Sequence, residues 1–260
     1  MKRALFLAVF SIIAVGQALA ADLPVRTAPP AAYIPVGPPT YNWGGLYVGI
    51  NGGYGFGQSQ WSDPRNPSGS TSTGDFGTSG GLVGLTIGGN LHTDVFVFGI
   101  EGDFDWQGIS GSSGSNFCTS LITSPNIGAT TAGVSCKTES NWLGTIRGRA
   151  GYAWDRVLLY ATAGGAGGNV RTALSGLPLQ NHAEFGWTAG GGVEVALADN
   201  WTAKLEYLFV DLSNTSCNQA SSCGFAIAAT ALPTAAISAN NGVTFNENIV
   251  RVGVNFIFKP

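Results

Sequence analysis

Hydrophobic and polar residues alternate with a period of two along much of the chain. From Gly45 onward, Leu46, Val48 and Ile50 occupy one parity, while Gly49 and Asn51 occupy the other. A strand with one apolar face and one polar or small face produces this pattern. The alternation recurs in segments near 45–57, 79–91, 94–107, 140–153, 156–168, 184–198, 200–211 and 244–258. Each has the roughly ten tilted residues that a β-strand needs to cross a bilayer, so the pattern predicts about eight transmembrane strands.

The connections between these segments alternate between short and long. Three are tight polar turns, "LHTD", "AWDR" and "ADN". The other four are long, near 58–78, 108–139, 169–183 and 212–243. Strict alternation brings all long loops to one end of an up-and-down sheet, as in outer-membrane barrels with short periplasmic turns and long external loops. The predicted fold is therefore all-β, an eight-stranded antiparallel up-and-down transmembrane barrel.

A soluble barrel or sandwich also alternates, but it buries its apolar parity and exposes its polar one. Here the polar parity consists mostly of Gly, Asn and Thr with isolated charges, which is too sparse for a solvated surface. The final segment, "NIVRVGVNFIF", places Val252, Val254 and Phe256 on one face and Arg251 and Asn255 on the other. This pattern favours the membrane barrel.

The N-terminus reads as an export signal. Lys2 and Arg3 precede an apolar stretch and an Ala-Leu-Ala site, so residues 1–20 are expected to form a signal peptide. A Pro-rich periplasmic linker is expected over 21–43, and the barrel over 44–260. Charged residues make up only 10% of the chain, against roughly 25% in soluble domains. The net charge of −3 excludes a basic nucleic-acid footprint.

The few charges of the strands fall on the parity opposite to the apolar one. With the apolar parity facing lipid, the inward-facing charged residues are Glu101, Asp103, Asp105, Arg147, Arg149, Glu194, Lys204, Glu206 and Arg251. Because an eight-stranded barrel is just wide enough for its own side chains, we expect these residues to form an ion-pair network that fills the lumen. Glu101 or Asp103 is expected to pair with Arg147 or Arg149 on the neighbouring strand.

Four cysteines lie in two polar segments of this exported chain. Cys118 and Cys136 share one predicted external loop, and Cys217 and Cys223 share another. Local disulfide pairing is the simplest of three connectivities, and free thiols or a metal site are the alternatives. No C-x-x-C spacing supports a metal site.

Several stretches together resemble one bacterial family. They are "ADLP", "WGGLYVGINGGYGFG", "FGIEGDFDW", "WLGTIRGRAGYAWDRVLLYATAG", "WTAGGGVEVAL", "WTAKLEYLFVDL" and "RVGVNFIF". The chain resembles the porin-family or outer-membrane immunogenic proteins of alpha-proteobacteria, which have an OmpA-type barrel. The resemblance implies a surface-exposed protein amid outer-membrane lipid and lipopolysaccharide, inserted by the barrel-assembly machinery through its C-terminal strand. Members usually end on an aromatic residue, whereas here Lys259 and Pro260 follow Phe258.

Three functions compete. A structural, surface-exposed envelope component is expected, and a narrow small-solute porin is the alternative, disfavoured by the crowded lumen. An enzyme acting on lipid A would need a catalytic group at the outer rim. His92 falls in a periplasmic turn, and His182 has Ser175 and Glu184 near it in sequence but no nucleophile motif. We therefore expect no catalytic residue, metal or cofactor, and the sequence indicates no ligand for the loops.

Overall fold

The computed structural model describes the barrel and its near surroundings. The described residues are 41–62, 71–120, 135–174, 180–212, 215–216 and 242–259. The predicted signal peptide, 1–20, and nearly all of the predicted linker, 21–43, lie outside them. No helix among the described residues is long and apolar enough to cross a bilayer.

Eight long strands close into a barrel. They are β1 (Gly45–Ser62), β2 (Phe76–Thr93), β3 (Phe96–Ser113), β4 (Cys136–Trp154), β5 (Val157–Leu174), β6 (Gln180–Ala196), β7 (Trp201–Asp211) and β9 (Gly242–Phe258). Each pairs antiparallel with its neighbour in chain order, and β9 pairs with β1 to close the sheet. A two-residue strand, β8 (Thr215–Ser216), pairs with the start of β9. The predicted eight-stranded up-and-down barrel is confirmed.

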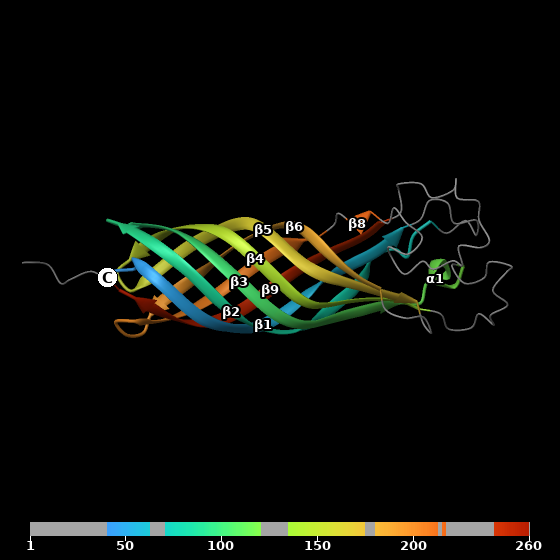
Figure 1. Cartoon of the computed structure of the whole chain (residues 1–260), viewed down its shortest axis with the longest axis horizontal. Coiled ribbons are helices and arrows are strands. Elements are labelled where there is room, and N and C mark those ends of the chain that lie inside the picture. The colour runs from blue at the N-terminus through green and yellow to red at the C-terminus, as the bar shows by residue number, and fades with distance from the viewer. Residues whose placement is uncertain are drawn as a thin grey trace, which may run out of the picture. The chain divides into compact units, whose positions relative to one another are not determined.

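The short turns and the C-terminus lie at one end of the barrel (Figure 1). Asp94 and Asp155 take positive φ values of 54° and 50° in the turns after β2 and β4. Aspartate tolerates this left-handed conformation because its short polar side chain hydrogen-bonds locally. The short helix α1 (Asn116–Ser120) and β8 lie at the opposite end (Figure 1). We call these the periplasmic and external ends.

The outer wall of the barrel is apolar over the part nearer the turns. Aliphatic side chains stand exposed around its middle, as in Ile146 at 72% and Ile100 at 67%. Aromatic side chains flank this band at both ends: Tyr54, Trp106, Phe185, Trp187 toward the external end, and Phe96, Tyr152, Trp154, Trp201, Phe258 toward the periplasmic end. An apolar band between aromatic girdles is the surface of a transmembrane barrel.

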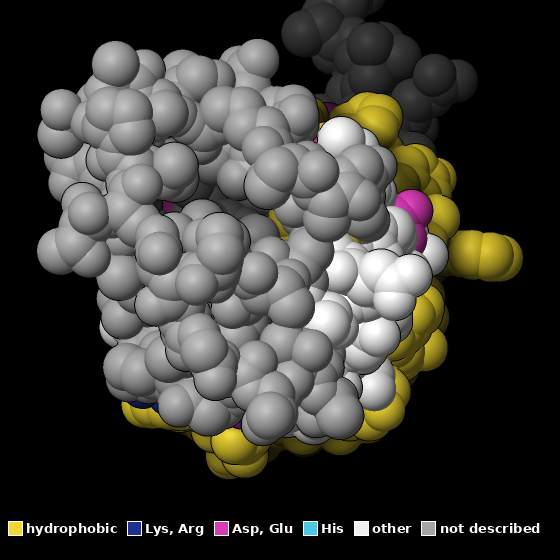
Figure 2. Space-filling model, turned by 90° about the vertical axis from the view of Figure 1, so that its right-hand side faces the viewer, with side chains coloured by type: hydrophobic (Ala, Val, Ile, Leu, Met, Phe, Trp, Pro, Cys, Tyr) yellow, Lys and Arg dark blue, Asp and Glu magenta, His cyan; other side chains and the backbone are white. Residues whose placement is uncertain are grey.

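Toward the external end, the composition of the two faces inverts. On β1, the outward side chains change from Tyr54 and Phe56 to Gln58, while the inward ones end with Trp61, which is fully buried. Viewed from that end, hydrophobic side chains appear along the outer wall, and the nearer described surface shows mainly backbone and side chains that are neither hydrophobic nor charged (Figure 2). A wall of this composition is expected to face water and not lipid.

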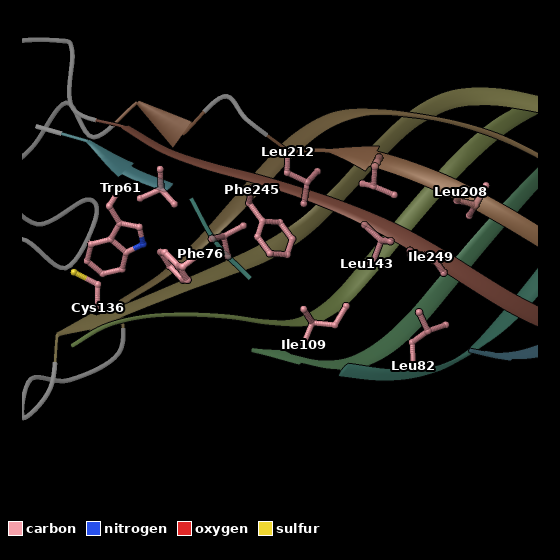
Figure 3. Packing of buried hydrophobic residues seen from close by; sticks show 14 of the residues in the cluster. Trp61, Phe76, Leu82, Ile109, Cys136, Leu143, Leu208, Leu212, Phe245 and Ile249 are labelled. Atoms are coloured by element: carbon pink, nitrogen blue, oxygen red, sulfur yellow. The ribbon is translucent and has the colours of Figure 1, made fainter. Parts of the chain in front are cut away.

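A buried apolar cluster fills the external part of the barrel, and we call it the external core. Figure 3 shows its side chains pointing into the space that the strands enclose. Its members are Trp61, Phe76, Leu82, Ile109, Phe117, Cys118, Cys136, Leu143, Ala166, Val170, Leu208, Val210, Leu212, Val243, Phe245 and Ile249. This part of the chain packs as a soluble β-barrel does, with its apolar side chains inside.

The inversion explains why the strands are longer than their sequence segments. Most have 17–19 residues and run into the ranges expected as loops, 58–78, 108–139, 169–183 and 212–243. The prediction relied on apolar residues facing out. Toward the external end the period of two continues, but the apolar residues face inward and the polar ones outward. A segment with a polar outward face resembles a polar loop in sequence.

Candidate functional site: the filled lumen

Arg147 lies at the centre of a charged layer in the lumen. It projects from β4 opposite Glu101 of β3 in the ladder. Its guanidinium nitrogens lie 2.6 Å from a Glu101 carboxylate oxygen, 2.5 Å from Asp103 Oδ2 and 3.0 Å from Glu206 Oε1. Its Nε donates to Thr145 Oγ1 at 3.2 Å. One arginine thus joins β3 and β4 to β7, which lies across the lumen.

Arg251 makes a second set of ion pairs in the lumen, from β9. Its guanidinium lies 2.9 Å from Asp105 Oδ2, 3.0 Å from Asp103 Oδ1 and 2.6 Å from Glu206 Oε2. In the sheet, β1 and β2 separate β9 from β3. The contacts with Asp103 and Asp105 therefore span the lumen, whereas Glu206 lies directly opposite Arg251 on the neighbouring strand β7.

Arg149 extends the layer toward the periplasmic end. Its Nη2 lies 2.8 Å from Glu194 Oε2, and its guanidinium lies 4.0 Å from the centre of the Tyr160 ring. The Tyr47 hydroxyl accepts from Arg149 Nη1 at 3.1 Å and donates to Glu101 Oε2 at 2.8 Å. Lys204 Nζ also lies 2.9 Å from Glu101 Oε2 and completes the set of cations.

The structure places all nine charged residues of the predicted set inside the barrel. The most exposed of them is Asp103, at 7%. Each base has at least one carboxylate within 2.9 Å. Such pairing is required, because an unpaired charge away from water costs several kcal/mol. We call these nine residues the ionic layer.

Two glycines make room for Tyr47 and Tyr160, which hydrogen-bond carboxylates of the ionic layer. A Cβ at Gly88 would lie 2.4 Å from the Tyr47 hydroxyl, and a Cβ at Gly192 would lie 2.8 Å from that of Tyr160. A larger residue at either position would displace a ring that hydrogen-bonds a buried carboxylate. Glycine in these strands therefore serves the packing of a narrow lumen.

Glu247 is a buried acid that the sequence reasoning missed. It lies on β9, fully buried, between Phe245 and Ile249 of the external core on the inward face of the strand. Gln107 Nε2 lies 3.5 Å from its Oε2, while its Oε1 has no hydrogen-bond partner. Its parity could have revealed it, because Glu247 stands four residues before Arg251 on the same face of the strand.

A short segment before β1 closes the periplasmic end, and we call Tyr41–Trp43 the strap. Trp43 is fully buried, and its indole N–H donates to the carbonyl of Asp155 at 2.9 Å. The Tyr41 hydroxyl donates to the carbonyl of Asp199 at 3.0 Å. Lys259 Nζ lies 4.0 Å from the centre of the Tyr41 ring. The linker prediction included these residues, but their aromatic side chains pack with Val97, Leu158 and Tyr160.

Replacing Tyr41 with phenylalanine is expected to lower the free energy of unfolding by about 1 kcal/mol, the usual value of one hydrogen bond. The hydroxyl bonds the turn between β6 and β7, while the ring can keep its packing. Urea titration of the refolded barrel measures the change. Tyr152→Phe, on the outer wall, is the matched control and should leave the midpoint unchanged. Equal midpoints for the two variants would contradict the role of the strap.

The cysteine and histidine predictions have different outcomes. Cys118 and Cys136 form a disulfide, with their Cα atoms 5.6 Å apart, whereas Cys217 and Cys223 lie outside the described residues. His92 Nδ1 accepts a hydrogen bond from the Trp43 backbone N–H at 3.4 Å, so it positions the strap. Among the described residues, no three His, Cys, Asp or Glu side chains are placed to hold a metal ion.

The catalytic group considered from sequence falls only partly within the described residues. His182 lies within β6, as does Glu184 two residues later, and Ser175 lies outside the described residues. Among the residues whose side chains are described, the buried carboxylates of the lumen contact cations, hydroxyls and amides of the barrel itself.

A closed barrel with an apolar, aromatic-girdled outer band and a lumen filled by paired charges defines an integral outer-membrane β-barrel protein. Comparison with known proteins agrees. Residues 18–258 match the family model of the outer membrane protein beta-barrel domain, and the chain belongs to this family. The family resemblance stated from the sequence and the outer-membrane location are thereby confirmed.

Named relatives extend this result. The chain is 35% identical over 225 residues to the 31 kDa outer-membrane immunogenic protein of Brucella melitensis biotype 1, covering 81% of this chain and 87% of that protein. It is 32% identical over 177 residues to the 22 kDa outer membrane protein of Rhizobium leguminosarum bv. viciae, covering 66% of each. The crystal structure of Neisserial surface protein A, at 12% identity and a TM-score of 0.38, covers 82% of this chain and 97% of that one. That last likeness is too distant to bear on function.

Proposed function

We propose that this protein is a non-conducting structural component of the outer membrane, a scaffold that holds its external loops at the cell surface. The observation that carries the proposal is the filling of the lumen at three successive levels. The strap occupies the periplasmic end, the ionic layer the middle, and the external core the other end.

Each level opposes the passage of a solute in its own way. A hydrated ion would have to lose its water to enter the external core, which is apolar. In the ionic layer it would have to displace side chains such as Arg147 and Arg251, both at most 1% exposed and each held by at least three carboxylate contacts. These obstacles act in series, so removing one leaves the others in place.

The purified protein is expected to show no steady open state in planar lipid bilayers, with at most rare and small openings. The measurement is single-channel conductance across a range of voltages, with the detergent alone as the blank. A larger general porin reconstituted in the same lipid serves as the positive control. A reproducible, long-lived open state of the monomer would instead support the narrow porin.

The absence of catalysis is part of the proposal. Its support is that the lumen carboxylates are used in internal pairs and that the described outer wall presents apolar side chains. The proposal also includes surface exposure of the loops, which the word "immunogenic" in the names of the Brucella relatives supports.

We further propose that the barrel-assembly machinery inserts this chain through β9. Phe256 and Phe258 lie on its outward face at the periplasmic end, where Phe258 pairs with Leu46 of β1. Lys259, which follows the terminal aromatic, contacts the ring of Tyr41 in the strap. The extra residue thus has a place in the finished barrel.

A further inference from the structure

Two opposite walls of the barrel touch at the external end. The Trp61 indole N–H of β1 donates to Thr138 Oγ1 of β4 at 2.9 Å, and Ser59 Oγ lies 3.0 Å from the same oxygen. In the sheet, β2 and β3 separate these two strands. The contacts therefore cross the external mouth of the barrel, and the Trp61 side chain spans the lumen there from β1 to β4.

The helix α1 lies at this end of the barrel (Figure 1). A helix of five residues has no stability of its own, because nucleation is unfavourable and few hydrogen bonds follow it. Nevertheless, Phe117 and Cys118 within it are fully buried, and both belong to the external core together with Trp61. The helix is therefore stabilised by its packing against the external core.

A single disulfide bond joins this helix to β4, the strand whose Thr138 accepts the hydrogen bond from Trp61. Cys118 of α1 is bonded to Cys136, which is the first residue of β4 and stands two residues before Thr138. Both sulfur-bearing residues are fully buried. The bond therefore restrains the helix at the point where the two walls meet.

We propose that α1 is a lid on the external mouth, that Phe117 is its seal, and that the Cys118–Cys136 disulfide is its fastener. Without the bond, the five-residue helix leaves the mouth, Phe117 withdraws from the external core, and water reaches the level of Trp61 and Ser59. The ionic layer lies deeper and stays closed, so this inference stands independently of whether the barrel conducts.

Labelling of a buried cysteine tests the lid. Ser59 is 1% exposed, so in the full-length chain Ser59→Cys is a reporter of access to the mouth. Cys217 and Cys223 are replaced by serine throughout. A charged, water-soluble maleimide is then applied to the refolded barrel, once with Cys118 and Cys136 bonded and once with both as serine.

We expect labelling at position 59 to become at least ~10-fold faster when the disulfide is absent, the factor that corresponds to roughly 1.4 kcal/mol in an opening equilibrium. Ser112→Cys is the matched control, because Ser112 is exposed on β3 near the same end and should label equally in both backgrounds. Phe117→Ala with the disulfide intact should raise the rate at position 59 as well, since it removes the seal and leaves the fastener.

Equal labelling rates at position 59 in the two backgrounds would overturn the proposal. A rise at position 59 accompanied by loss of heat-modifiable migration would overturn it too, because the whole barrel would then have loosened. If Ser59→Cys does not refold, Ser140→Cys on β4 replaces it as the reporter, since Ser140 is also 1% exposed and lies on the lumen side. The same two outcomes decide the question there.

Discussion

Replacing Arg147 with alanine is expected to destabilise the barrel by about 3–5 kcal/mol, the cost of removing one partner from a buried ion pair. Its guanidinium lies within 3.0 Å of Glu101, Asp103 and Glu206, and its side chain is fully buried. Without it, three carboxylates remain close together with fewer cations to compensate them. The urea midpoint should fall, and heat-modifiable migration should be lost at a lower temperature.

Two further variants separate this effect from a general loss of charge. Lys137→Ala removes an exposed ion pair with Glu139, and such a pair contributes about 0–1 kcal/mol. Adding Asp103→Asn to Arg147→Ala removes one of the uncompensated carboxylates and should restore part of the lost stability. An Arg147→Ala barrel with the wild-type urea midpoint and migration would show that the ionic layer does not support the fold.

Ile146→Arg, one residue away from Arg147, is expected to lower the free energy of unfolding by about 2–4 kcal/mol. Here the loss comes from adding a charge to the lipid-facing side of the strand, whereas in Arg147→Ala it comes from removing a charge from the lumen. Ile146 is 72% exposed and faces outward from the middle of β4. Its side chain is therefore expected to contact lipid and not water. A guanidinium there would be transferred from water into hydrocarbon. Folding into lipid vesicles should become less complete, and the urea midpoint in vesicles should fall.

The control for this second variant is Ser110→Arg. Ser110 is exposed and outward-facing on β3, in the part of the wall where the composition has inverted. That part is expected to face water, so the new charge should change the midpoint little. Equal losses at the two positions would place the boundary between lipid and water elsewhere than between Trp106 and Ser110.

The period-two pattern was sufficient to predict the barrel and the inward face of most strands. Glu101 and Arg147 share a parity with their strands' other inward residues, and a charge on the lipid face is too costly to occur near the middle. The contacts of Arg251 with Asp103 and Asp105 could not be predicted in the same way. They depend on how far strands three positions apart are staggered around the barrel, which no local pattern encodes.

Two other features were missed because the surroundings change along the barrel. Trp61 and Phe245 follow the same alternation as the membrane strands, but there the apolar side faces inward. A pattern alone does not tell whether lipid or water lies outside. Trp43 and Tyr41 stand in a Pro-rich stretch, and only the arrangement of the periplasmic turns shows where two aromatic rings can be buried.

The inverted outer part of the wall works as a pedestal. On β4, the residues from Cys136 to Asn141 precede Trp142, which pairs with the girdle residue Trp106 of β3. About six residues at roughly 3.3 Å each, tilted by about 45°, raise the strand end by about 14 Å. The external end of the strand therefore stands well beyond the apolar, aromatic-girdled band, on a stem whose interior the external core fills.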